Sequence, residues 1–151
     1  MMKRKFSKFI LAAFALLLVI HLALGQRVFV TRATAVSVNL PADFAGCEIA
    51  QLSELRSVRS QKQADRILEQ VEAISPDCIA LTGDLVNSGY YSRAFGTDGE
   101  KLTLGLLARL TAVAPVYYLY GDREMMLLDD PVHNTFRAQI EALGVTMLPV
   151  T

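Results

Sequence analysis

Three short charged runs, each placed directly after an apolar stretch, constrain the fold more than any other feature of this sequence. The runs occupy residues 53–56, 83–87 and 121–124. In a parallel sheet the carboxyl ends of the strands meet at one edge, and the loops that follow them line a common crevice. The spacing therefore predicts that parallel strands deliver these charged residues to one rim of a sheet.

The remainder of the chain alternates between strand patterns and helix patterns. Apolar runs or alternating residues predict strands, and apolar residues at helical spacing predict helices between them. We expect strands at residues 35–40, 47–53, 78–82, 116–120 and 145–148, and helices at 57–74, 102–113 and 131–143. The fold class is α/β, with a mostly parallel sheet and flanking helices. Because such a half-sheet leaves apolar surface uncovered, we also expect the domain to be truncated at residue 151.

The first 25 residues form a targeting segment. Lys3, Arg4, Lys5 and Lys8 precede an uncharged apolar run at residues 9–20. This pattern predicts either a cleaved signal peptide or an uncleaved transmembrane signal anchor, and a buried core helix is a weaker alternative. We expect a tether at residues 26–34 and the domain at 35–151. The domain then lies on the extracytoplasmic side, exported or at the cell membrane.

Charge and cysteine content exclude several function classes. Four of the 15 Lys and Arg residues lie in the targeting segment, so the rest of the chain is mildly acidic against its 15 Asp and Glu residues. Nucleic acid is therefore not an expected partner, because binding to its phosphates needs clustered cations. Cys47 and Cys78 are the two cysteines and form no zinc or redox motif; they either pair or remain buried thiols.

The three charged runs contain both signs of charge. Carboxylates brought to one rim repel each other unless they share a cation, either a divalent metal or an arginine. The six residues concerned are Glu54, Arg56, Asp84, Asp122, Arg123 and Glu124.

The order of these motifs resembles the front half of the calcineurin-like metallophosphoesterases. That family carries Ser-Asp-x-His, then Pro-Asp followed by five residues and Gly-Asp, then Gly-Asn-His-Glu, each after a strand. This chain has similar runs at residues 53–56, 76–84 and 121–124, and the resemblance covers residues 40–148. It implies the N-terminal half of that family's α/β sandwich, in the branch with an N-terminal membrane or export segment. It further implies phosphoester hydrolysis by two divalent metal ions, commonly manganese, iron or zinc.

The resemblance assigns roles residue by residue. Asp84 stands at the bridging metal ligand, Glu54 at the family's aspartate ligand and Asp122 at its asparagine ligand. Arg56 stands at a histidine ligand and Arg123 at the catalytic histidine. A guanidinium group has no lone pair for a metal and stays protonated near neutral pH, so these two positions depart from the family.

These departures predict a pseudoenzyme with impaired catalysis. Arg56 and Arg123 would occupy the space of the metal ions, forming an ion-pair network that either locks the rim or binds the anion of a phosphoester ligand. The alternative is a non-catalytic, membrane-anchored binding or scaffold module, completed by a second chain that supplies the missing sheet. A fragmentary gene copy without a selected site also stays open. His133 matches no motif and is expected at the surface.

Overall fold

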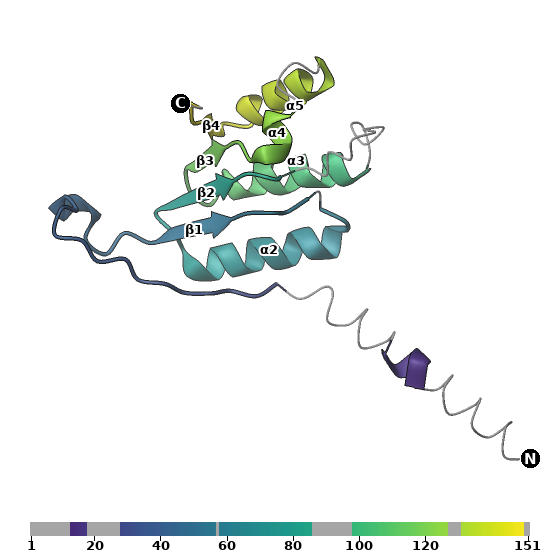
Figure 1. The fold of residues 1–151 in the computed structure, drawn as a ribbon, viewed down its shortest axis with the longest axis horizontal. Helices are drawn as coiled ribbons and strands as arrows, with labels where there is room; N and C mark the ends of the chain where they lie inside the picture. Colours follow the sequence, from purple (N-terminus) through teal and green to yellow (C-terminus); the bar gives the residue numbers. More distant parts are fainter. Residues whose placement is uncertain (1–12, 18–27, 57, 86–97, 127–130, 150–151) are drawn as a thin grey trace, which may run out of the picture.

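Strands and helices alternate along the chain in the computed structural model, which describes residues 13–17, 28–56, 58–85, 98–126 and 131–149 (Figure 1). The elements, in chain order, are the 3₁₀ helix η1 (Ala42–Phe44), β1 (Ile49–Leu52), α2 (Gln61–Ile74), β2 (Cys78–Thr82), α3 (Asp98–Leu110), β3 (Val116–Leu119), α4 (Asp122–Met125), α5 (Pro131–Ala142) and β4 (Thr146–Met147).

The four strands form one parallel sheet in the order β1-β2-β3-β4. The prediction of an α/β fold with a mostly parallel sheet is confirmed. Crossover connections between parallel strands are almost always right-handed, so a sheet that grows in one direction places its helices on one face. Consistently, α2 packs against α3 and α3 against α5, which gives a single helical layer (Figure 1).

Burial alternates along each strand and separates a covered face from an open face. Ala50, Ile79, Val116 and Tyr118 point towards the helices and are buried. Residues directly before or after them point the other way and remain partly or largely exposed. The open face carries no charged residue: it consists of Ile49, Gln51, Cys78, Ala80, Thr82, Tyr117, Leu119 and Thr146.

Local capping sets the ends of α2. The Ser60 side chain accepts a hydrogen bond from the Gln63 backbone N–H at 3.2 Å, so the helix begins three to four residues after the predicted start. Ser75 then adopts a left-handed conformation with φ 53° directly before Pro76, which ends the helix as the sequence predicts. Between these caps, Ile67, Leu68 and Val71 pack into the core.

The strand predicted at residues 35–40 is wrong. No residue of this segment is in a strand, and the segment ends in a turn. Val36 and Val38 are 91% and 99% exposed. An alternating pattern makes a strand only where a neighbouring strand supplies hydrogen bonds, and in the described structure this segment has none beside it.

The predicted targeting segment, residues 1–25, falls mostly outside the described residues, which include only the helical residues 13–17 of it. Within the described part of the chain, no helix is long and apolar enough to cross a membrane. The predicted loop at residues 87–99 also lies largely outside the described residues.

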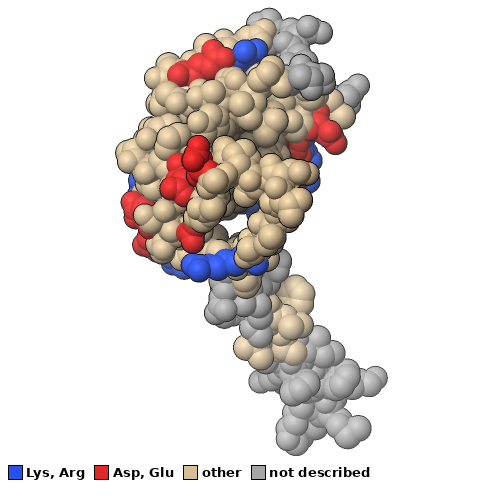
Figure 2. All heavy atoms as spheres, turned by 90° about the vertical axis from the view of Figure 1, so that its left-hand side faces the viewer, with Lys and Arg blue, Asp and Glu red and all other residues tan. Residues whose placement is uncertain are grey.

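The two cysteines lie at the starts of neighbouring strands. Cys47 precedes β1, Cys78 begins β2, and both are partly exposed free thiols. Charged side chains of both signs form small groups separated by uncharged surface on the face seen in Figure 2.

Candidate functional site

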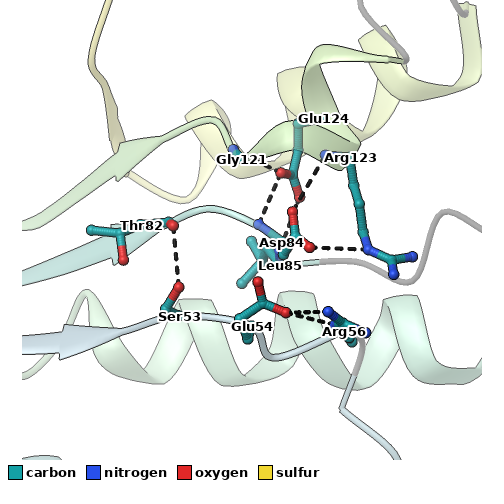
Figure 3. Close-up of polar contacts among 9 residues, drawn as sticks. All are labelled: Ser53, Glu54, Arg56, Thr82, Asp84, Leu85, Gly121, Arg123 and Glu124. Carbon is teal, nitrogen blue, oxygen red and sulfur yellow. Dashed lines mark hydrogen bonds and ion pairs between the residues drawn. The ribbon is translucent and has the colours of Figure 1, made fainter.

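The loops that follow β1 and β2 are joined by backbone hydrogen bonds. The Glu54 N–H donates to the Gly83 carbonyl at 3.2 Å, and the Arg56 N–H donates to the Asp84 carbonyl at 2.9 Å. The Ser53 hydroxyl donates to the Thr82 carbonyl at 3.2 Å. The structure therefore brings the first two charged runs together at the carboxyl ends of their strands, as expected for a parallel sheet (Figure 3).

The loops after β2 and β3 meet through two glycines. A Cβ atom on Gly83 would lie 2.3 Å from the Gly121 Cα atom, and Gly83 itself has φ 88°. A side chain at either position would therefore push the two backbones apart. This close approach brings the third charged run against the second.

Glu124 holds the loops after β2 and β3 together through hydrogen bonds. Its side chain is fully buried and accepts three backbone hydrogen bonds, each of 2.9 Å. The donors are the N–H groups of Asp84, Leu85 and Gly121 (Figure 3). A carboxylate with three N–H partners is well satisfied in a buried position, so Glu124 holds the two loops together rather than pairing with a guanidinium.

Two arginines pair with two carboxylates at the rim. Arg123 Nε lies 3.0 Å from Asp84 Oδ2, and the Arg123 backbone N–H donates to Asp84 Oδ1 at 3.3 Å. Arg56 donates to Glu54 Oε2 at 2.6 Å. Asp84 is nearly buried, whereas Glu54 and Arg56 are half exposed. The pair formed by Arg123 and Asp84 is therefore largely shielded from solvent. Water screens the attraction between Arg56 and Glu54.

The structure places the charged residues of the predicted ion-pair network in different kinds of contact. Among the described residues, Arg123 pairs with Asp84 and Arg56 pairs with Glu54, whereas Glu124 accepts hydrogen bonds from the backbone. Asp122, the fourth carboxylate, begins α4 and is exposed. At this position its charge lies at a helix N-terminus, where a carboxylate is favourable.

Backbone strain is concentrated at the same rim. Among the described residues other than glycine, Glu54, Arg56, Ser75 and Asp84 have positive φ, between 47° and 57°. Ser75 ends a helix, where this conformation is common. The other three are the rim residues themselves, and left-handed conformations cost roughly 1–2 kcal/mol per L-residue. Strain of this kind accumulates at functional sites, which supports a role for the rim beyond packing.

Tyr118 lies beneath the rim on the covered face of β3. Burial raises the pKa of Tyr118 above its ordinary value, and the nearby negative charge of Glu124 raises it further. In the described structure no hydrogen bond to its hydroxyl meets standard geometry. This hydroxyl therefore stays neutral under physiological conditions.

The rim does not fit the metal centre that the resemblance implies. Across the described ranges, no group of three or more His, Cys, Asp or Glu side chains is arranged to hold a metal ion. Both oxygens of Asp84 already accept hydrogen bonds from Arg123, and Arg56 offers no lone pair. His133 lies in the first turn of α5, and its side chain is outside the described set.

Sequence reasoning missed two features of the site. One is the four-residue helix α4, and the other is the use of Glu124 as a backbone clamp. Glu124 is the third residue after Gly121, which is the spacing of a capping box, so this signal was present in the sequence. Its contacts with Asp84 and Leu85 had no such signal, because they join residues about 40 positions apart.

The fold and the rim together define a parallel α/β domain whose site is built from carboxylates and guanidinium groups at the carboxyl ends of the strands. Comparison of the chain with protein-family models, curated proteins and solved structures finds no match. The geometry of the rim therefore carries the functional argument.

Proposed function

We propose that this chain is a non-hydrolysing relative of the calcineurin-like metallophosphoesterases, in which arginines replace the metal ions. The parallel sheet with its three charged runs at one rim supports this proposal. So does the order of the motifs, which follows the front half of that family. On this proposal the domain corresponds to the N-terminal half of the family's α/β sandwich.

The pair formed by Arg123 and Asp84 is the observation that carries the proposal. By resemblance Asp84 is the bridging metal ligand, and its Oδ2 atom lies 3.0 Å from Arg123 Nε. A guanidinium that is always protonated supplies the positive charge that a metal ion would supply. It neither activates water nor donates a proton near neutral pH, so the phosphoester bond is not cleaved.

Metal content and turnover test this proposal. The full chain is incubated with Mn²⁺, Fe²⁺ or Zn²⁺ and dialysed, and bound metal and hydrolysis of bis(4-nitrophenyl) phosphate are measured. We expect less than stoichiometric metal and no metal-dependent turnover. Stoichiometric metal with metal-dependent turnover in the unchanged chain would refute the proposal.

A matched pair of variants sharpens the test. Arg56→His restores a histidine where the family has a ligand, frees Glu54 from its ion pair and is expected to raise Zn²⁺ content. Arg59→His adds the same side chain at an exposed position just before α2 and is expected to leave metal content unchanged. Equal metal content in both variants would show that the rim has no residual metal geometry.

Binding of a phosphoester ligand without cleavage is the second candidate function. The exposed fractions of the Arg56 and Arg123 side chains, 49% and 28%, favour it. The charge balance opposes it, because the rim holds four carboxylates against two guanidinium groups. Titration of the full chain with phenyl phosphate separates the two candidates, since the metal-free relative proposed above needs no phosphate affinity.

We further infer that the domain acts outside the cytoplasm, held at the membrane or released from it. The cationic and apolar pattern of the first 25 residues supports this inference. Protease treatment of intact cells distinguishes the location, because only an extracytoplasmic domain is cleaved.

A further inference from the structure

One strand edge and one segment with a strand-like sequence have no strand partner in the described part of the chain. β1 lies at the edge of the sheet, so one side of its backbone has no neighbouring strand. Residues 35–40 have the alternating composition of a strand but pair with nothing. The two features match, because the free N–H and C=O groups of an edge strand can form hydrogen bonds with a second backbone that is extended beside it.

The edge of β1 lacks the features that normally protect an edge strand. Its sequence, Ile49–Leu52, contains no charge, no proline and no bulge. The opposite edge is different, since β4 has only two residues and Pro149 follows shortly after it. Short strands and prolines block pairing, whereas an uncharged regular edge invites it. An additional strand is therefore expected at β1 and not at β4.

Residues 35–40 have the sequence pattern of that strand, although in the single chain they end in a turn. The hydrogen bonds that they make are local turn contacts, from the Asn39 N–H to the Ser37 hydroxyl and from the Leu40 N–H to the Ser37 carbonyl. Val36, Val38 and Leu40 share one side of an extended chain, and Ser37 and Asn39 share the other. This two-sided pattern suits a strand with one side against the helical layer and one side on the open face.

The segment is held away from β1 of its own chain. Figure 1 shows the stretch before η1 passing α2 on the side opposite to β1 and then running on beyond the end of α2 to η1. Val28 packs against the core at one end of this stretch. At the other end, η1 is closed by hydrogen bonds from Phe44 to Pro41 and from Ala45 to Ala42. In this arrangement residues 35–40 make no strand pairing with β1 of their own chain.

We propose that two copies of this chain associate by strand addition. Residues 35–40 of each copy pair with the β1 edge of the other, placing Val36, Val38 and Leu40 towards the partner's helical layer. The two contacts are equivalent, so the dimer closes with two-fold symmetry. Strand addition supplies main-chain hydrogen bonds to both unpaired backbones.

Site-specific cross-linking of the full chain tests this proposal. A photoreactive amino acid replaces Val36, and isotopically labelled and unlabelled chains are mixed before illumination. We expect a covalent dimer in which a labelled peptide containing residue 36 is joined to an unlabelled peptide containing Ile49–Leu52. The same probe at Met126, which is 79% exposed at the end of α4, is expected to give no such product. Cross-links confined to single chains, or cross-links between chains that avoid β1, would overturn the proposal.

A proline variant provides the second test. Val38→Pro removes a backbone N–H from the middle of the segment and should lower the yield of the dimer at least tenfold. Val38→Thr keeps the N–H and a β-branched side chain, and should keep the yield within about twofold. Because Val38 is 99% exposed in the single chain, neither change should alter the fold of the unassociated chain, measured by circular dichroism. Equal yields from the two variants would contradict pairing through this backbone.

Discussion

Glu124 shows how one buried side chain can organise a charged rim. Its two oxygens accept hydrogen bonds from the loops after β2 and β3, and these loops carry Asp84 and Arg123. The position of the ion pair between Asp84 and Arg123 therefore depends on Glu124, although Glu124 is not a member of that pair. The sequence identified Glu124 as part of the rim, but its role follows from contacts across about 40 residues.

We predict that Glu124→Gln destabilises the domain strongly. The amide nitrogen would face a backbone N–H in place of an oxygen, leaving at least one buried donor unpaired. Loss of such a charge-assisted bond costs about 3 kcal/mol in the free energy of unfolding. Urea unfolding measures this loss, with Glu141→Gln as control. Glu141 is half exposed in an ion pair with Arg137, so its loss should cost under about 0.5 kcal/mol. Similar losses for the two variants would contradict the clamp role of Glu124.

At the scale of elements, the sequence predicted correctly those boundaries that neighbouring residues in the chain set. β2 has the predicted bounds, and α2 ends where Ser75 and Pro76 predict. The segment at residues 35–40 failed because strand formation depends on a neighbour, which an alternating pattern does not supply. α4 was missed because four residues are too few to show helical periodicity.

We predict that Ser75→Gly stabilises the domain. Ser75 has φ 53° at the end of α2, a conformation that glycine adopts without steric strain. The gain in the free energy of unfolding should be about 0.5–1 kcal/mol, measured by thermal unfolding. Ser60→Gly, at the other end of the same helix, removes a side-chain cap and should lose a few tenths of a kcal/mol. A loss of stability in Ser75→Gly would show that the Ser75 side chain matters more than its backbone conformation.

At the scale of the whole molecule, the strand order decides which face of the sheet becomes the core. Sequential parallel strands place α2, α3 and α5 in one layer, so half of each strand's side chains lack cover. The continuous apolar run of β2 is typical of a strand that is covered on both faces. The structure covers one face, because α2, α3 and α5 lie on the same side of the sheet.

A pair of identical substitutions tests this asymmetry. Ile79→Ala removes a fully buried side chain from the covered face and should cost about 2–4 kcal/mol in the free energy of unfolding. Ile49→Ala changes a side chain that is 58% exposed on the open face, and should cost under about 1 kcal/mol. Chemical denaturation of the two variants gives both values. Equal costs would mean that the open face is covered in solution.

The sequence by itself determined the alternation of strands and helices and the placement of charged runs after the strands. Both are local properties, set by the periodicity of apolar residues and by the residues that end each element. Tertiary structure alone decided the pairing of Asp84 with Arg123, the capture of three backbone N–H groups by Glu124 and the open face of the sheet. These depend on residues distant in the sequence that only the packed sheet brings into contact.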